Sequence, residues 1–260
     1  MDRIFVVQAE YWKKENPTDG LLIQVALKEF CGRNMDSFQT TAGMQSPGEI
    51  LADIRSKFPG HRVVPVGSIE FAKTFLEAET GKCRMEPIEV PECMRDMLCR
   101  HYKIVPGYEL SSEEKSGTYF IKDASELKAF NNSLIDGNIS RYIREDRDYV
   151  VTERTVFDSE WRVFVYHDDI RDVKLYQGEA YALPSEKTLL KMIGRYSIEN
   201  HPGAYTLDIG TRRHNGIRIT EPLEVHPFVS CGLYGFYDSK LPDMWDEGYE
   251  WYLAKNLMRQ

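Results

Sequence analysis

Hydrophobic and polar positions in the first third of the chain follow two different periods. Residues 3–9 (RIFVVQA) form a short aliphatic run bounded by charge, which predicts a strand, whereas residues 21–33 carry apolar side chains at 21, 22, 25, 26 and 30, close to the period of a helix. Residues 62–68 (RVVPVGS) again predict a short buried strand, with a proline near the edge of its sheet. This alternation over residues 1–90 indicates a small α/β unit with some parallel pairing.

The segment SPGEILADIRSKFPG carries start and stop signals for a second helix. Ser46 can cap it, Pro47 suits its first turn, and Glu49 stands three residues after the cap, the spacing of a capping box. Pro59 and Gly60 are typical of the residues that end a helix. The local sequence therefore predicts both ends of this helix.

After prolines at positions 87 and 91 the pattern changes to short polar segments, which marks a boundary. Residues 117–125 predict a strand that leads into a turn, and residues 125–131 a short helix capped by Ser125. Residues 148–182 predict three antiparallel strands, the last two joined by the turn HDD. The remaining predicted elements are a helix at 185–198, strands at 205–210 and 217–228 joined by a loop at 211–216, and a closing helix at 245–259.

Composition narrows the class of protein. The chain has 260 residues, 42% of them hydrophobic, enough for a sizeable core in one large domain or in two or three lobes. A formal net charge of −8 argues against a protein that holds a nucleic-acid backbone over a broad surface. No stretch approaches the roughly 20 apolar residues that cross a membrane, and no secretory segment is visible at the N-terminus. The five cysteines form neither a CxxC pair nor a disulfide framework, which suits reduced thiols and a cytoplasmic location.

Two charged residues at the ends of predicted strands have a structural and a functional interpretation. Lys122 ends the run YFIK and is either a surface lysine whose stem lies on apolar atoms or, inside a cleft, a donor for a phosphate. Glu153 follows VVT, where a strand can leave one lobe for another. It is either an exposed strand residue or an acceptor for the hydroxyls of a ribose.

Arg162 lies in the run EWRVFV, where every second residue is expected to be buried. Because an unpaired buried charge is costly, Arg162 needs a partner, either a carboxylate or a phosphate. Glu160 is two residues away on the same strand face and can itself be that partner. Lys174 lies on the strand expected to pair with this one, and together with Lys122 these cations would form a cradle for a polyphosphate.

Acidic residues and a histidine occur in the last two predicted strands. Glu224 and His226 are two positions apart and share one strand face, with Glu221 on the opposite face if the strand is regular, and Asp208 lies in the neighbouring run YTLDIG. Carboxylate oxygens suit Mg²⁺, which takes its other ligands from phosphate and water, whereas imidazole is more typical of zinc or a transition metal. No HExxH motif or cysteine cluster supports a zinc site. Magnesium carried on a nucleotide is the preferred interpretation, with His226 as a ligand or as a substrate or phosphate contact; solvated acids on edge strands are the alternative.

The order of the motifs YFIK, VVTE, EWRVFV, VKLYQG, TLDIG and EPLEVHPFVSCGLYGF resembles that of the ATP-grasp superfamily. It most resembles the clade of small phage and bacterial members distinguished by two arginines and a lysine. The match runs from about residue 118 to the GLYG segment, and VVPVGSIEF is similar to the strand and turn that precede the nucleotide domain there.

The resemblance implies a fold and a set of roles. The fold would be α/β and α+β, with an N-terminal α/β domain (1–95), a small ATP-grasp lobe (96–152) and a large lobe (153–260) that clasp a nucleotide. The cofactors would be ATP and Mg²⁺. The implied roles are phosphate binding by Lys122, adenine and ribose contacts by Glu153, catalysis and phosphate or acyl-phosphate contacts by Arg162 and Lys174, and metal binding by Asp208 and Glu224.

The implied activity is ligation of a carboxylate to an amine or a thiol through an acyl-phosphate. The partners would be a small-molecule or peptide carboxylate and an amine or thiol acceptor, with no membrane and no nucleic acid; the sequence is silent on oligomeric state. A phosphotransferase that uses the same site and a binding module without catalysis are the alternatives.

The chain departs from the family pattern in three places. His226 stands where superfamily members usually have asparagine, although an imidazole nitrogen can occupy the same ligand position. The glycine-rich phosphate loop is reduced to Ser116-Gly117. The candidates for the second arginine of the clade are Arg195, Arg212, Arg213 and Arg218.

Overall fold

The first sheet of the computed structural model, which describes residues 2–8, 11, 14, 16–31, 38–40, 46–133, 135 and 137–258, is parallel. Its strands, in the order β2-β1-β3, are β1 (Arg3–Val7), β2 (Phe38–Thr40) and β3 (Arg62–Val66). The predicted first and last strands and their parallel pairing are confirmed, whereas β2 was not predicted. Pro65 lies in an edge strand, as expected for a residue that cannot donate a ladder hydrogen bond.

Three helices pack around this sheet: α2 (Pro17–Phe30), α3 (Pro47–Lys57) and α4 (Ile69–Thr80). The predicted capping box of α3 is confirmed, because Glu49 N donates to Ser46 Oγ at 3.2 Å and Ser46 N donates to Glu49 Oε2 at 2.8 Å. Residues 9, 32, 33 and 259, to which the predicted elements extended, lie outside the described residues.

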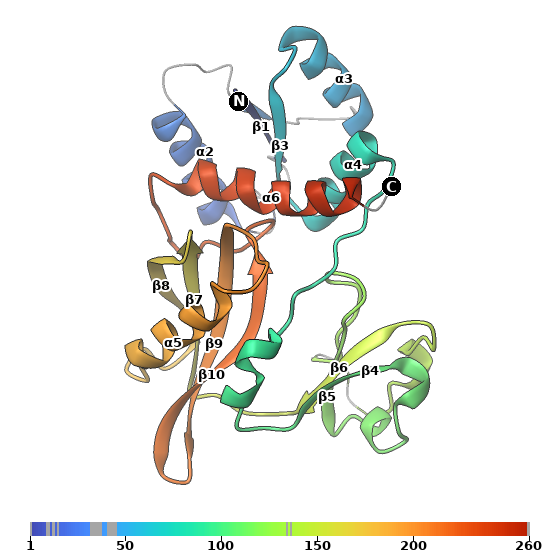
Figure 1. Cartoon of the computed structure of the whole chain (residues 1–260), viewed down its shortest axis with the longest axis vertical. Coiled ribbons are helices and arrows are strands. Elements are labelled where there is room, and N and C mark those ends of the chain that lie inside the picture. The colour runs from blue at the N-terminus through green and yellow to red at the C-terminus, as the bar shows by residue number, and fades with distance from the viewer. Residues whose placement is uncertain are drawn as a thin grey trace.

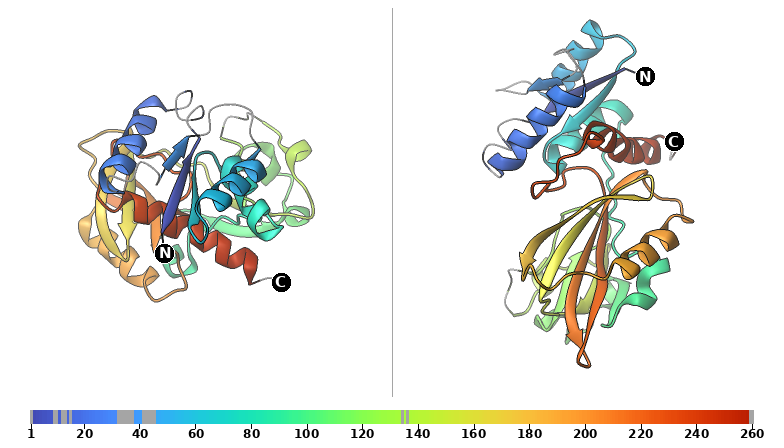
Figure 2. Two further views of the ribbon diagram at one scale, coloured as in Figure 1. Left: turned by 90° about the horizontal axis from the view of Figure 1, so that it is seen from above. Right: turned by 90° about the vertical axis from the view of Figure 1, so that its left-hand side faces the viewer.

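The closing helix α6 (Leu241–Leu257) returns the C-terminal part of the chain to the first sheet. It crosses between the first sheet and the largest sheet (Figure 1; Figure 2). Asp246 on this helix accepts hydrogen bonds from Arg3 at 3.3 Å and Arg62 at 2.9 Å, which lie on β1 and β3. Its apolar side chains belong to the same core as those strands, so the two ends of the chain are packed together. In the described part of the chain, no helix is both long and apolar enough to cross a membrane.

The small-lobe sheet is antiparallel and has its own core. Its strands, in the order β4-β6-β5, are β4 (Tyr102–Pro106), β5 (Tyr119–Asp123) and β6 (Asp148–Glu153). The helix predicted at 125–131 is wrong: the Asp123 carboxylate accepts from the N–H groups of Ser125 and Glu126 at 2.8 and 3.0 Å, and Lys128 is left-handed, with φ +56°. Short 3₁₀ turns lie around this sheet: η2 (Glu92–Met97), η3 (Gly107–Glu109), η4 (Glu114–Ser116) and η5 (Ser140–Tyr142).

The large-lobe sheet is antiparallel, with the order β10-β9-β7-β8. Its strands are β7 (Ser159–Tyr166), β8 (Asp169–Gly178), β9 (Ala204–His214) and β10 (Ile217–Pro227). Helix α5 (Glu186–Tyr196) packs on one face, against Trp161, Val163 and Val165 (Figure 2). The opposite face is left for the polar residues of β7, β9 and β10. The first of the three strands predicted within 148–182 is β6, which pairs in the other sheet.

The connection between β9 and β10 is shorter than predicted. Residues 211–216 were expected to form a loop, but β9 continues to His214 and the turn consists of Asn215 and Gly216. Both have positive φ, +51° and +79°, which asparagine and glycine adopt more readily than other residues and which matches the twist of a two-residue hairpin. Arg212 and Arg213 are therefore strand residues, with fixed faces.

Candidate active site

Four charged side chains form a row across the large-lobe sheet. Arg162 on β7 lies opposite Lys174 on β8 and opposite Asp208 on β9, and Asp208 lies opposite Glu224 on β10. Directly opposite residues of antiparallel strands project to the same face. The order across the sheet is therefore cation, cation, carboxylate, carboxylate, on the face that α5 does not cover. The predicted pairing of the Lys174 strand with the Arg162 strand is confirmed.

Arg162 is held by Asp208. Its Nε donates to Asp208 Oδ1 at 2.8 Å and its Nη2 to Asp208 Oδ2 at 2.7 Å, a two-point contact, while Nη1 donates to the Gly232 carbonyl at 3.2 Å. Burial opposes the charged guanidinium, but the Asp208 carboxylate raises the pKa of Arg162 further, so Arg162 stays charged. The suggestion that Glu160 pairs with Arg162 is wrong, because Glu160 accepts instead from the Tyr176 hydroxyl at 2.8 Å.

Lys122 reaches this row from the small lobe. Its side chain is 17% exposed and does not hold its ammonium group out in water. Its Nζ lies 2.9 Å from Glu89 Oε1 and donates to Glu89 Oε2 at 3.2 Å, and it also donates to Glu224 Oε2. Lys122 thus shares two carboxylates, one from β10 and one from the segment that precedes the small lobe.

The two carboxylates respond differently to this shared lysine. Burial raises the pKa of Glu89 to about 7, with Lys122 opposing the rise and Glu224 adding to it. Burial alone would also raise the pKa of Glu224, but Lys122 lowers it to about 2. Glu224 is therefore ionised at neutral pH, as a magnesium ligand must be.

Sequence reasoning missed Glu89. It follows Ile88 in the proline-bounded segment that was interpreted only as a boundary, and no local pattern signals its role. In the structure it forms an isolated bridge with Val225, whose N–H donates to the Glu89 carbonyl at 2.8 Å. Only this tertiary contact brings its carboxylate to Lys122.

His226 lies one pair further along the sheet, opposite Thr206. Its Nδ1 is 2.6 Å from the Pro227 carbonyl, which can only accept, so Nδ1 carries the proton of the neutral ring. Its Nε2 is then a bare acceptor, and in the described structure it is buried and has no hydrogen-bond partner. Burial lowers the pKa of His226 to about 4, so the ring is neutral at physiological pH.

Acidification is expected to destabilise the protein through His226. The unfolded chain binds a proton near pH 6.5, whereas the buried imidazole resists it until about pH 4. The cost is absent above about pH 6.5 and grows to about 3 kcal/mol as the pH falls to about 4. We expect the difference in unfolding free energy between the wild-type protein and His226→Asn to shrink over this range, as measured by denaturant titration. A difference that does not change with pH would contradict the assignment.

The donor set fits magnesium only with help from a bound phosphate. Among the residues that the structure describes, no three His, Cys, Asp or Glu side chains are grouped so that they could hold a metal ion. Asp208 and Glu224 are nevertheless opposite one another on neighbouring strands, and His226 Nε2 is an unused donor on the same strand face as Glu224. Because Mg²⁺ commonly takes one or two carboxylates and fills its shell with phosphate oxygens and water, this pair suits a nucleotide-borne ion.

Comparison with known proteins identifies the fold that carries this row. A family model described as an ATP-grasp domain, R(2)K clade family 2, matches residues 100–243, more than half of the chain. The chain belongs to this ATP-grasp family. The predicted superfamily and the ATP-grasp fold, with mixed helices and antiparallel sheets, are therefore confirmed.

Solved structures with the ATP-grasp fold align along almost the whole chain. The D-alanine–D-alanine ligase from Bacillus anthracis has a TM-score of 0.52 at 12% identity, with 98% of this chain and 99% of the ligase chain covered. A RimK domain ATP-grasp protein from Sphaerobacter thermophilus (TM-score 0.45, 10% identity, coverage 98% and 100%) and the ATP-grasp ligase PsnB with its minimal precursor (0.42, 13%, 98% and 100%) are also similar. A search of curated proteins found no match.

A second ionic cluster joins the two lobes of the ATP-grasp domain; we call Arg100, Arg212 and Glu221 the junction cluster. Glu221 is fully buried and accepts from Arg100 Nη1 at 3.2 Å, Arg212 Nε at 2.5 Å and the Cys99 N–H at 3.0 Å. Arg100, just before β4, also donates to Thr152 Oγ1 on β6 at 3.1 Å. The cluster therefore fixes the small-lobe sheet to β10.

The junction cluster depends on an irregularity in β10. The sequence placed Glu221 and Glu224 on opposite faces of a regular strand, but the register shifts between Pro222 and Glu224. Glu221 lies opposite Gly210 and Glu224 opposite Asp208, two residues away on β9, so both glutamates face the same side. The expectation of opposite faces is wrong because the bulge adds one residue between them.

The four candidates for the second clade arginine lie in different places. Arg195 on α5 donates to Asp96 and to the Cys93 carbonyl, on the far face of the large-lobe sheet. Arg213 donates to the Gly216 carbonyl and Arg218 to the Tyr181 carbonyl, near the hairpin end. Of the four, Arg212 shares the β9 face with Asp208. Arg100, which was not considered, lies beside it.

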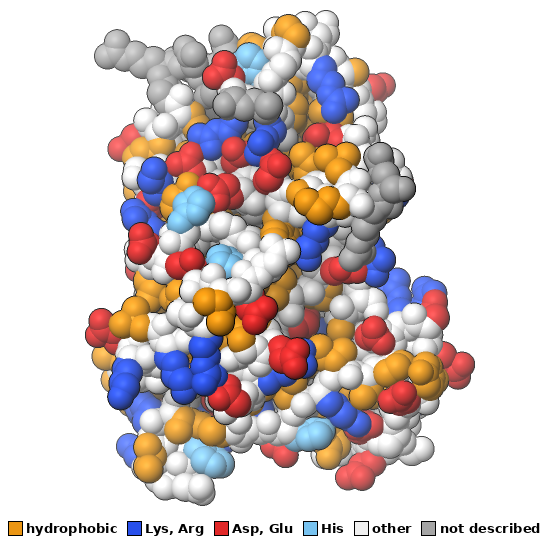
Figure 3. Space-filling view, in the orientation of Figure 1, with side chains coloured by type: hydrophobic (Ala, Val, Ile, Leu, Met, Phe, Trp, Pro, Cys, Tyr) orange, Lys and Arg blue, Asp and Glu red, His pale blue; other side chains and the backbone are white. Residues whose placement is uncertain are grey.

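The other predicted site residues of the ATP-grasp domain are more exposed. Glu153 ends β6, where the chain leaves the small-lobe sheet, and its side chain is exposed. Lys174 Nζ lies 2.7 Å from Asp172 Oδ2, with both side chains about one-third exposed (31% and 33%). Across the face shown in Figure 3, basic and acidic side chains are interspersed.

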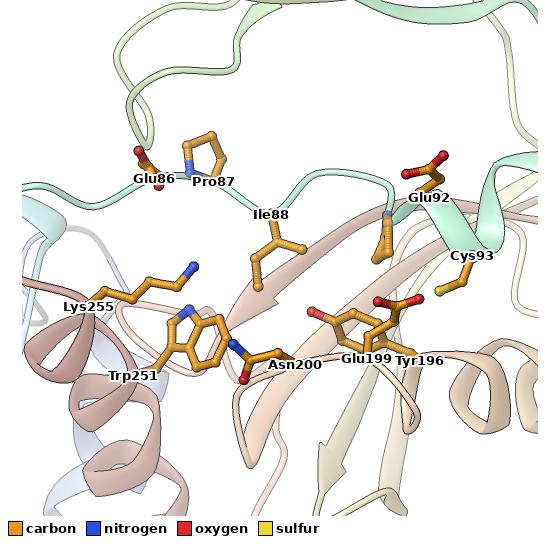
Figure 4. A pocket seen from close by; sticks show the side chains of 11 residues that line it. Glu86, Pro87, Ile88, Glu92, Cys93, Tyr196, Glu199, Asn200, Trp251 and Lys255 are labelled. Carbon is orange, nitrogen blue, oxygen red and sulfur yellow. The ribbon is translucent and has the colours of Figure 1, made fainter. Parts of the chain in front are cut away.

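A cavity of about 420 Å³ lies apart from the charged row, on the other side of Glu89. It is lined by the segment 86–93, the end of α5 and the helix α6 (Figure 4). In that view Ile88 and Trp251 face one another across the opening, with Glu92 toward one end and Lys255 toward the other. Its walls thus include the backbone that carries Glu89.

Proposed function

We propose that this ATP-grasp protein is an ATP- and magnesium-dependent ligase that joins a carboxylate to an amine or a thiol through an acyl-phosphate. The observation that carries the proposal is the cross-sheet row of Lys174, Arg162, Asp208 and Glu224, faced by Lys122 from the small lobe. Three cations and two carboxylates meet between two lobes, which is the charge pattern that a magnesium–polyphosphate requires. Arg162 and Lys122 supply the arginine and lysine of the clade pattern in this proposal, and Arg212 the second arginine.

The ion pairs of the structure support this proposal by their arrangement. Arg162 pairs with Asp208, and Lys122 with Glu224. A phosphate chain with its magnesium ion, inserted along the row, would give each cation an anionic partner and each carboxylate a cationic one. The exchange leaves no buried charge unpaired, so the desolvation already present in these pairs is put to use for the ligand.

The roles of the remaining residues follow from their positions. Lys174 extends the cationic end of the row, where the outermost phosphoryl group or an acyl-phosphate would lie, and Glu153 at the edge of the small lobe is proposed to accept from the ribose. Asp208 and Glu224 would hold the magnesium ion, which supplies charge neutralisation at the phosphates when bound, and His226 would offer Nε2 as a further donor.

The proposed reaction needs little covalent help from the protein. The substrate carboxylate attacks the terminal phosphorus of ATP and forms an acyl-phosphate with release of ADP; the amine or thiol then attacks the acyl carbon and phosphate leaves. Positioning and charge neutralisation account for most catalysis of phosphoryl transfer. The small-molecule or peptide class of the carboxylate is proposed from the implied ligase activity.

The test is titration calorimetry with a non-hydrolysable ATP analogue, with and without Mg²⁺. We expect magnesium-dependent binding that is lost in Asp208→Asn combined with Glu224→Gln, because both metal contacts disappear. The matched control is Asp169→Asn combined with Glu145→Gln, which neutralises two exposed acids outside the row. Circular dichroism establishes that each variant is folded. Absence of wild-type binding with every divalent ion would overturn the proposal. Binding with transfer of phosphate to a stable product, and no use of an amine or thiol, would favour the phosphotransferase.

A further inference from the structure

Glu89 is the point at which three parts of the molecule meet. It belongs to the linker, defined here as residues 86–93, which leads from the first sheet to the small lobe (Figure 1). Its backbone carbonyl is bonded to Val225 N of β10 at 2.8 Å, and its carboxylate holds Lys122 of β5. It precedes residues 100–243, the part of the chain that the family model matches.

The conformation of Glu89 indicates that its side chain is needed. Its φ is +61°, in the left-handed region that a glutamate rarely adopts and that glycine would adopt without strain. The side chain is nevertheless present and the residue is only 4% exposed. Backbone strain that is kept in this way commonly marks a functional position.

The contacts of Glu89 place its carboxylate on the large-lobe side of the Lys122 pair. Val225, to which its backbone is bonded, is the neighbour of Glu224 in β10, so Glu89 and Glu224 are fixed to the same strand. Lys122 comes from the other lobe and lies between them. The pair Glu89–Lys122 is therefore a contact between lobes that does not depend on Glu224.

We infer that Glu89 is a positioning residue: it keeps Lys122 charged and directed at the row when Glu224 turns to the magnesium ion. This inference rests on the proposed function. Without Glu89, Lys122 would have Glu224 as its carboxylate partner, so the ammonium group and the metal ion would compete for one side chain. With Glu89 present, Glu224 can leave the lysine without stranding a buried charge, which would be costly.

The first test compares Glu89→Gln, which keeps the size of the side chain, with Glu92→Gln, an exposed glutamate of the same linker. In Glu89→Gln we expect the affinity for a magnesium-loaded ATP analogue to fall about 10- to 100-fold. The magnesium concentration for half-saturation should rise as well, because Lys122 now competes for Glu224. Glu92→Gln should behave as the wild-type protein in both measurements. Equal binding by wild-type and Glu89→Gln would overturn the inference.

A double-mutant cycle separates positioning from a simple loss of negative charge near the metal. In a Lys122→Met background, a positioning role predicts that Glu89→Gln has no further effect on magnesium dependence, whereas a charge effect would persist and would overturn the inference. Removing both charges also avoids a stranded ion if Glu89→Gln alone folds poorly. As a second variant, Glu89→Asp keeps the charge one methylene further from Lys122 and should lie between the wild-type protein and Glu89→Gln.

The outcomes distinguish this inference from the proposed function. If the wild-type protein binds no nucleotide, both fall together. If it binds in a magnesium-dependent manner and the response is unchanged in Glu89→Gln, the nucleotide site stands and only the role of Glu89 is lost.

Discussion

Replacing Lys174 by alanine is expected to reduce ATP turnover by about 10²- to 10³-fold, comparable with the loss of one preorganised donor to a transition state. Lys174 lies opposite Arg162 at the cationic end of the row, where charge develops on the transferred phosphoryl group in the proposed reaction. Its ion pair with Asp172 is about one-third exposed, so its loss should change the free energy of unfolding by less than about 1 kcal/mol. The measurement is steady-state ADP release, with the melting temperature followed in parallel.

Lys174 is a cleaner choice than Arg162 for this experiment. Removal of Arg162 would leave Asp208, which is 4% exposed, as an unpaired buried carboxylate, so lost activity could come from unfolding. The matched control is Lys191→Ala, an exposed lysine of α5 on the far side of the same sheet. Undiminished turnover in a folded Lys174→Ala protein would remove Lys174 from the catalytic set.

The largest loss of stability is expected for Glu221→Gln. The variant removes the one charge of the junction cluster that opposes two guanidinium groups, of which Arg100 is almost fully buried. Breaking a buried pair by removing one partner typically costs about 3–5 kcal/mol, because the remaining charge cannot regain water. Chemical denaturation monitored by circular dichroism measures this loss directly.

Glu145→Gln is the control for that measurement, because Glu145 is an exposed glutamate of the small lobe. It should change the free energy of unfolding by no more than about 0.5 kcal/mol. If Glu221→Gln were equally mild, the two arginines would have other partners and the cluster would not join the lobes as described. Loss of small-lobe structure before the rest of the protein would support the joining role.

Local signals in the sequence predicted most of the regular elements. The capping box at Ser46, the alternation in residues 159–166 and the apolar period of α5 each depend on neighbours within a few positions, which is the range over which side chains set backbone geometry. The short predicted helix at 125–131 failed because the carboxylate of Asp123 captured the backbone N–H groups that a helix would have used in its first turn.

The candidate site was predictable in its residue types and strands but not in its pairings. Lys122, Arg162, Lys174, Asp208 and Glu224 were identified from charge placed in apolar strands and from the order of family motifs. Their partners were not, because Lys122 and Glu224 are 102 residues apart and Lys122 and Glu89 are 33 apart. Such contacts are made when sheets pack, and no sequence period encodes them.

By itself the sequence determined the ATP-grasp family, the strand and helix signals, and the set of charged residues offered to one face of a sheet, because each is carried by local pattern or motif order. Only the tertiary structure decided which charges meet. The bulge between Pro222 and Glu224 turned Glu221 to the same face as Glu224, and the bridge from Glu89 to Val225 brought a linker carboxylate to Lys122. Register and packing choose among equally charged partners, since an ion pair is favourable with any carboxylate that the fold brings within reach.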